Sequence, residues 1–191
     1  MSQTLDQATE SVNQIFDLYT RFGNDDYIGE PVSQIEHMSQ AAQLAIDEGF
    51  DDEVVLAAFF HDIGHLCAAI PENSMGGYGV KSHGDIGAEY LLKKGFSKRV
   101  AQLVQNHVQA KRYLTYRQPS YYDSLSEASK KTLVYQGGKM TEEEAVRFEM
   151  DPLFEASIRM RKWDELAKEE HVSLISLEEL RKRALDVLMN A

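Results

Sequence analysis

A histidine and an aspartate stand side by side in the most apolar part of this chain. The run from Val54 to Cys67 reads VVLAAFFHDIGHLC, which predicts one central helix that is apolar on nearly all sides. His61 and Asp62 are costly to bury there unless a partner compensates them. A metal ion is such a partner, because neutral imidazole and ionised carboxylate both bind metals. The chain is therefore expected to fold so that further ligands meet at this helix.

Helical periodicity extends along almost the whole sequence, and no segment alternates with the period of a strand. The first helix is expected to bury Val12, Ile15, Phe16 and Tyr19 and to end at Gly23. Another is expected from about Ser124 to Tyr135. Residues that typically cap helices predict the other starts, and these are Ser33, Asp51 or Asp52, Ser82, Ser97, Thr141 and Ser176. We expect an all-α fold with a single domain over residues 1–191.

Composition excludes several classes of function. The net charge of −11 argues against a nucleic-acid partner, because no surplus of Lys and Arg is available to replace phosphate counterions. No apolar run reaches the roughly 20 residues that a membrane-spanning helix needs, and the N-terminus has no secretory signal pattern. The single cysteine, Cys67, fits a reducing cytoplasm and is expected to be a small core residue. An anionic substrate would need local positive charge.

Five of the six histidines lie between positions 37 and 107. A lone histidine on a helix is more often a core or surface residue than a ligand, and His171, in a run of charged residues, is assigned to that class. The others form a set with two carboxylates. One metal shell would contain His37, His61, Asp62 and Asp164, and Asp62 could bridge to a second ion held by His83 and His107. Nitrogen and oxygen ligands without thiolate favour Fe, Mn, Zn or Ni.

The order His, His-Asp, His, His, Asp resembles the HD-domain superfamily, whose fold is a helical bundle with metals at its centre. The two additional histidines, His83 and His107, are typical of its dinuclear branches. Those branches contain both hydrolases that resemble cyclic-nucleotide phosphodiesterases and oxygenases such as myo-inositol oxygenase.

Flanking motifs narrow the resemblance. They are DYIGE from Asp26, HDIGH from His61, MGGYGV from Met75, KRYL from Lys111, YQGG from Tyr135 and RKWD from Arg161. Together, from about residue 23 to 168, they resemble the mixed-valent di-iron oxygenases that break carbon–phosphorus bonds. That family oxidises a 1-hydroxyphosphonate with O₂ to a carboxylate and phosphate. Its substrates include 1-hydroxy-2-(trimethylammonio)ethylphosphonate, which gives glycine betaine, and the 2-amino analogue, which gives glycine.

The resemblance implies a role for each matching residue. One iron would be held by His37, His61, Asp62 and Asp164, and the other by Asp62, His83 and His107. The positions that match phosphonate ligands are His65, Lys111, Ser129 and Arg161. Tyr27 and Glu30 match a mobile loop in which the tyrosine occupies an iron site until substrate enters and the glutamate meets the substrate amine. The resemblance also implies an upstream hydroxylase that supplies the substrate.

Helical spacing supports two of these roles independently. Lys111 is one turn beyond His107, and Arg161 is three residues before Asp164, so each cation shares a helix face with a predicted ligand. Each could equally lie on a solvated surface if no metal were present. Residues 25–27 could likewise be only a turn with a surface aromatic, although Gly29 and Pro31 fit a mobile loop beside a rigid stop.

Alternatives to the oxygenase are a dinuclear phosphohydrolase acting on a small phosphate ester and a non-catalytic sensor on the same scaffold. A need for O₂ separates the first from an oxygenase, and absence of turnover would favour the second. A quaternary ammonium needs aromatic faces or a carboxylate nearby, which Tyr27, Tyr78, Tyr113 and Glu30 could provide. These tyrosines favour the N-methylated substrate over the amine.

Overall fold

The computed structural model of this chain describes residues 3–27, 29–67, 75–77 and 79–190. Within those ranges it contains helices and no β-strand, and a lone bridge pairs Asp26 with Ser33. The all-α prediction is confirmed. In chain order the helices are α1 (Leu5–Phe22), α2 (Gln34–Asp47), α3 (Asp52–Phe60), α4 (Ile63–Cys67), α5 (His83–Lys93), α6 (Lys98–Arg117), α7 (Pro119–Ser124), α8 (Glu127–Tyr135), α9 (Glu142–Glu149), α10 (Phe154–Leu166) and α11 (Leu177–Met189).

Most predicted helix starts are confirmed by the capping bonds. Ser33 and Thr141 each form a reciprocal capping box with the glutamate three residues later, at the starts of α2 and α9. The side chains of Asp51, Ser97 and Ser176 accept backbone N–H bonds at the starts of α3, α6 and α11. These bonds satisfy donors that have no partner inside the helix.

The prediction of one helix from Val54 to Cys67 is wrong. The helix ends at Phe60, the chain turns at His61 and Asp62, and α4 begins at Ile63. Across this turn His65 N–H donates to the carbonyl of Asp62, three residues back. His61 therefore follows the end of α3, whereas His65 lies within α4.

A further expectation needs correction. Ser82 precedes α5 as predicted, but it has a φ of 61° and makes no capping bond with its side chain. The helix expected from about Ser124 to Tyr135 is α8, which begins at Glu127, and a separate helix, α7, ends at Ser124. The side chain of Ser126 accepts from Ser129 N–H and caps α8.

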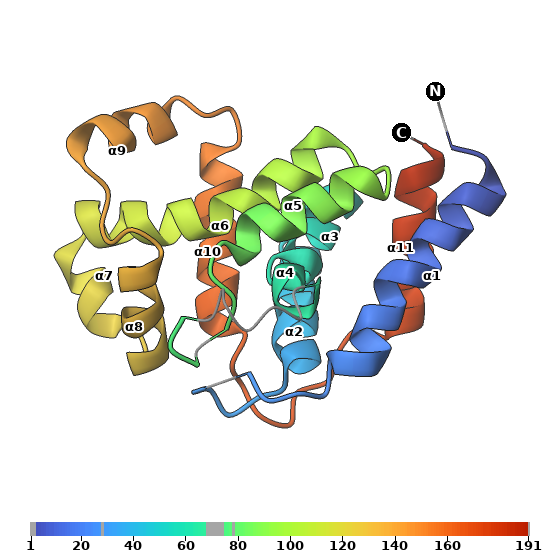
Figure 1. Cartoon of the computed structure of the whole chain (residues 1–191), viewed down its shortest axis with the longest axis horizontal. Coiled ribbons are helices and arrows are strands. Elements are labelled where there is room, and N and C mark those ends of the chain that lie inside the picture. The colour runs from blue at the N-terminus through green and yellow to red at the C-terminus, as the bar shows by residue number, and fades with distance from the viewer. Residues whose placement is uncertain (1–2, 28, 68–74, 78, 191) are drawn as a thin grey trace.

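Helix α3 lies at the centre of the molecule (Figure 1). Its residues from Val54 to Phe60 are fully buried, and it packs against α2, α6, α10 and α11. Helices α1 and α11 pack together at one end, whereas α7, α8 and α9 lie at the other end. This arrangement holds the α3–α4 turn, with its histidine and aspartate, between the surrounding helices.

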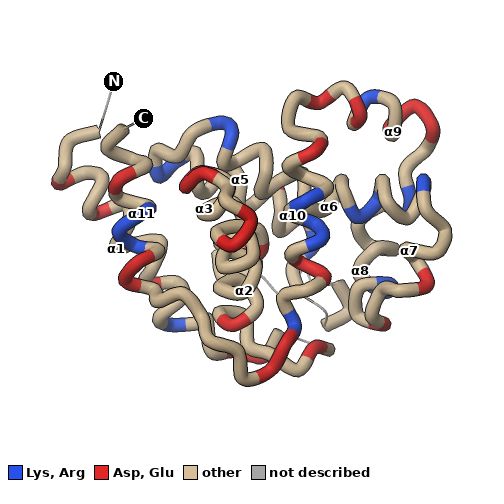
Figure 2. The backbone as a smooth tube through the Cα atoms, turned by 180° about the vertical axis from the view of Figure 1, so that it is seen from behind, with Lys and Arg blue, Asp and Glu red and all other residues tan. Residues whose placement is uncertain are grey.

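Charged residues are spread over the outer elements. Figure 2 shows acidic and basic positions interspersed at both ends of the described chain, with no continuous basic stripe. In the described part of the chain, no helix combines the length and apolar character that a bilayer crossing requires.

Candidate metal centre and adjoining cavity

Six predicted ligands converge at the centre of the helices. They come from α2, the α3–α4 turn, the start of α5, α6 and α10, although they are as much as 127 positions apart in the sequence, between residues 37 and 164. Their exposed fractions are His37 0%, His61 0%, Asp62 2%, His83 3%, His107 2% and Asp164 3%. A cluster of this polarity is costly to bury without compensating interactions.

The first group contains His37, His61 and Asp164. The Nε2 atoms of the two histidines are 3.0 Å apart. Asp164 Oδ1 lies 3.4 Å from the Nε2 atom of His37 and 3.9 Å from that of His61. These three donor atoms surround one point between α2, α3 and α10.

The second group contains Asp62, His83 and His107. The two histidine Nε2 atoms are 2.9 Å apart, and Asp62 Oδ1 lies 3.3 Å from His83 Nε2 and 3.4 Å from His107 Nε2. The other oxygen of Asp62 faces the first group, since Oδ2 is 3.5 Å from His61 Nε2 and 3.7 Å from His37 Nε2. Asp62 therefore presents one oxygen to each group.

The protonation of these four imidazoles makes the groups suitable for cations. Their Nδ1 atoms face backbone carbonyls at distances of 2.5–3.0 Å. A carbonyl can only accept, so each Nδ1 carries a proton, and the Nε2 atom of a neutral ring then presents a lone pair. Two facing lone pairs 2.9 or 3.0 Å apart repel each other unless a cation, which can be a metal ion or a proton, lies between them.

The separations also match the size of a metal site. Two ligand atoms about 2.1 Å from one ion are about 3.0 Å apart at a right angle and about 3.4 Å apart at a tetrahedral angle. The donor atoms within the two groups are 2.9 to 3.9 Å apart. The residues fit two metal ions with nitrogen and oxygen ligands, bridged by Asp62.

The electrostatics of the buried groups depend on their mutual contacts. Burial lowers the pKa of His61, but the charges of Asp62 and Asp164 outweigh it and raise this pKa to about 9. Burial raises the pKa of Asp164, whereas Arg161 and the histidines hold it well below its usual value. The carboxylates are therefore ionised, which is the form that binds metal.

A cavity of about 60 Å³ adjoins both groups. Lys111, on α6, lines it and is 3% exposed. Its Nζ donates to Thr132 Oγ1 at 2.7 Å, and no carboxylate pairs with it among the described residues. Burial, followed by the charge of Arg161, lowers the pKa of Lys111 well below its usual value. A buried ammonium in this position favours an anionic ligand.

Arg161 lines the same cavity from α10 and has several partners. Its Nε donates to the Tyr121 hydroxyl at 2.7 Å, and its Nη2 donates to Ser129 Oγ at 3.3 Å. Ion pairs to Asp164 and Glu165 complete its contacts. The structure thus brings Arg161 and Ser129 together beside the first group.

His65 also lines the cavity. Its ring stacks on that of His83 with centroids 4.1 Å apart. Its Nδ1 accepts the Val80 backbone N–H at 3.0 Å, which places the ring proton of the neutral form on Nε2. Burial, with the neighbouring His83, lowers the pKa of His65 to about 3. His65 is therefore a neutral donor.

The loop between α1 and α2 covers one side of the cavity. Tyr27 stacks on the His37 ring with centroids 4.1 Å apart. Burial and the charge of Asp62, to which its hydroxyl is hydrogen-bonded, raise its pKa well above the usual value. Glu30 also lines the cavity, and its Oε1 accepts bonds from Ser126 Oγ at 2.6 Å and Lys168 Nζ at 2.8 Å.

Tyr113, which was expected near the substrate ammonium, does not line the cavity. Tyr113 packs against Phe148 and Phe154 and donates to Glu149 at 2.7 Å, away from the residues that line the cavity. Tyr78 lies outside the described residues, as do Ile28 and residues 71–74 of the neighbouring motifs and loop.

The structure adds residues in and around the site to which the sequence analysis gave no role. They are Gln34, Tyr121, Thr132, Gln136 and Lys168. The Oε1 atoms of Gln34 and Gln136 are buried and have no hydrogen-bond partner among the described residues. Two of the added residues had a local signal. Gln136 lies in the YQGG motif, and Pro119, which is typical of the first turn of a helix, could have indicated the helix α7 that carries Tyr121.

Comparison with known proteins places this arrangement in a family. The HD domain matches residues 35–153, a range that includes every residue of the two groups except Asp164. The chain is 43% identical over 188 residues to the uncharacterised protein L432 of Acanthamoeba polyphaga mimivirus, covering 98% of this chain and 86% of the relative.

Two further relatives have named activities. A [1-hydroxy-2-(trimethylamino)ethyl]phosphonate dioxygenase (glycine-betaine-forming) of Leisingera caerulea is 40% identical over 159 residues, covering 83% of this chain and 79% of the relative. A hydroxymethylphosphonate dioxygenase of Gimesia maris is 35% identical over 173 residues, covering 89% of this chain and 84% of the relative. The chain belongs to the HD-domain family, in the same group as these phosphonate dioxygenases.

Proposed function

We propose that this protein cleaves the C–P bond of a small 1-hydroxyphosphonate with O₂ and releases a carboxylate and phosphate. The observation that carries the proposal is the position of Asp62, which presents one oxygen to each pair of facing imidazoles, beside the buried cation of Lys111. The names of the two dioxygenase relatives support the same reaction.

Two iron ions, as an Fe²⁺/Fe³⁺ pair, would supply the redox chemistry and the activation of O₂. His37, His61 and Asp164 would hold one, His83 and His107 the other, and Asp62 would bridge them. The absence of thiolate among these ligands fits iron. The hydrogen bonds from Nδ1 to backbone carbonyls would fix each ring with Nε2 toward the ion.

The remaining residues would bind and orient the substrate. Lys111, Arg161 and Ser129 would donate to phosphonate oxygens, and His65 would donate through Nε2. A dianionic phosphonate would supply the counter-charge that Lys111 lacks. Tyr27, which is hydrogen-bonded to Asp62, would move away when the C1 hydroxyl of the substrate enters. Burial of the site would exclude water.

The sequence resemblance offers two substrates, 1-hydroxy-2-(trimethylammonio)ethylphosphonate and its 2-amino analogue, and the Gimesia relative is named for a third, hydroxymethylphosphonate. In each case both atoms of O₂ enter the products. Carbon C1 loses four electrons and O₂ accepts them. The proposal includes an upstream hydroxylase that installs the C1 hydroxyl group, and a cytoplasmic location.

The test is phosphate release by iron-loaded protein from the three 1-hydroxyphosphonates, with and without O₂. The proposal expects phosphate and the matching carboxylate only in the presence of O₂, and expects Asp62→Asn to abolish both. Phosphate formed equally without O₂, or formed from phosphate esters, would identify a dinuclear phosphohydrolase instead.

A further inference from the structure

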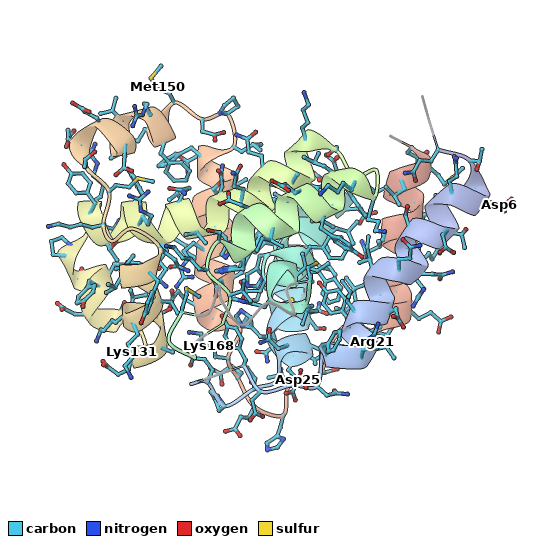
Figure 3. All side chains as sticks on the ribbon, in the orientation of Figure 1. Asp6, Arg21, Asp25, Lys131, Met150 and Lys168 are labelled. Atoms are coloured by element: carbon cyan, nitrogen blue, oxygen red, sulfur yellow. The ribbon has the colours of Figure 1, made fainter. Side chains whose placement is uncertain are left out.

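An ion pair holds Glu30, one of the residues that line the cavity. Lys168, two residues beyond α10, donates to Glu30 Oε1 at 2.8 Å, and Ser126 Oγ donates to the same oxygen at 2.6 Å. The side chains of Lys168 and Glu30 are 16% and 9% exposed. Figure 3 labels Lys168 between the end of α8 and the loop that carries Asp25. The pair joins the loop after α1 to the segments that precede α8 and follow α10.

This ion pair changes what Glu30 can recognise. A free carboxylate on the cavity wall attracts a cationic group of the substrate. Here the ammonium of Lys168 already compensates the Glu30 charge, and a second cation beside Glu30 would lie close to Lys168 as well. The attraction of the substrate cation to Glu30 and its repulsion by Lys168 are of similar size at similar distances, so they largely cancel. Without net attraction from Glu30, the cost of desolvating an ammonium substituent in this buried cavity is not compensated. A cationic substituent is therefore disfavoured while Lys168 remains paired with Glu30.

The other groups on the wall do not replace that lost attraction. The Oε1 atoms of Gln34 and Gln136 lack a partner among the described residues. They are uncharged acceptors, and a hydroxyl group can donate to them as well as an ammonium group can. A trimethylammonium group needs aromatic faces. Tyr27 is the tyrosine among the described cavity residues, and one face of its ring is already stacked on His37.

We propose that Lys168 determines substrate class by neutralising Glu30, so that the enzyme selects 1-hydroxyphosphonates without a cationic substituent at C2. The inference rests on the proposed function and deepens it. The simplest substrate of this class is hydroxymethylphosphonate, which with one O₂ gives formate and phosphate. The C–P bond and the C1–H bond break, and C1 transfers four electrons to O₂.

The test compares kcat/KM for hydroxymethylphosphonate, 2-amino-1-hydroxyethylphosphonate and its trimethylammonio analogue. The wild type is expected to favour the first by at least about tenfold, and Lys168→Met to shift the ratio toward the cationic substrates by at least about tenfold. Lys168→Arg keeps the charge and is expected to retain wild-type selectivity. Lys162→Met, an exposed position on α10, is the matched control and is expected to change nothing.

Binding provides a readout that does not need turnover. Ethylphosphonate and 2-aminoethylphosphonate differ only in the cationic group, and Lys168→Met is expected to tighten the second relative to the first. A wild type that favours the ammonium substrates, or a Lys168→Met variant with unchanged selectivity in both assays, would overturn the inference. The expected binding shift without O₂-dependent phosphate release from any substrate would support the inference and refute the proposed function.

Discussion

Replacement of Lys111 by methionine is expected to weaken activity while stabilising the substrate-free protein. The ammonium is 3% exposed, donates to Thr132 Oγ1 and has no carboxylate partner among the described residues. Burial and the charge of Arg161 lower its pKa well below the usual value, so the charged form is disfavoured in this place. Methionine retains most of the aliphatic stem and removes the charge.

The magnitudes follow from these contacts. Loss of a charge-assisted bond to a phosphonate oxygen costs about 1.5–3 kcal/mol, which lowers kcat/KM about 10- to 150-fold. Removal of an under-compensated buried charge is expected to stabilise by about 1–3 kcal/mol. For a chain of this length that raises Tm by about 2–10 °C.

The assays are phosphate release under O₂ and thermal unfolding of the substrate-free protein, with Lys93→Met as control. Lys93 is paired with Glu89 on the exposed face of α5, so its replacement is expected to change stability by less than about 0.5 kcal/mol. A Lys111→Met variant that is less stable than the wild type and equally active would refute the assignment of Lys111 as an anion ligand.

Three further predictions test the metal centre and its surroundings. Removal of metal with a chelator is expected to lower Tm, and Fe²⁺ to restore it in proportion to its concentration, because the facing imidazole pairs repel each other without a cation. Tyr121→Phe is expected to raise KM for the phosphonate by about tenfold with less effect on kcat, since it removes the hydroxyl that orients the guanidinium on α10. Gly64→Ala is expected to destabilise the fold by more than about 3 kcal/mol, since a Cβ there would lie 1.9 Å from the His83 carbonyl oxygen.

Each of these has a matched control. Protein whose Tm is independent of metal would contradict the two-ion site, and His171→Ala, at an exposed position, is expected to leave metal binding unchanged. Tyr122→Phe, at a residue 43% exposed, is expected to leave KM unchanged. Gly49→Ala meets no atom within 4 Å but has a φ of 77°, so its cost is expected to be about 1 kcal/mol. Equal costs at Gly49 and Gly64 would contradict the close approach of α4 to α5.

Helices and their starts could be predicted from the sequence because the signals are local. A capping box such as Ser33 with Glu36 spans four residues, and an apolar stripe repeats every turn. The turn after Phe60 could not be predicted in this way. It depends on Gly64 packing against the backbone of His83 and on His61 Nδ1 bonding to the Ala58 carbonyl, and the first of these is a tertiary contact.

The candidate ligands were predicted from residue type and order and from the family resemblance, whereas the positions of their donor atoms needed coordinates. Asp62 was expected to bridge the two ions, but the sequence does not say which of its oxygens faces which histidine pair. The ion pair of Glu30 with Lys168 spans 138 positions, and no local pattern predicts it. The same holds for the contact of Tyr121 with Arg161, which spans 40 positions.

The most direct test of the account is the stoichiometry of the reaction. Iron-loaded protein would be given hydroxymethylphosphonate, and O₂ consumed, formate and phosphate would be measured together. The account predicts one formate and one phosphate for each O₂ consumed, because C1 transfers four electrons to one O₂. Phosphate released without consumption of O₂ would contradict it.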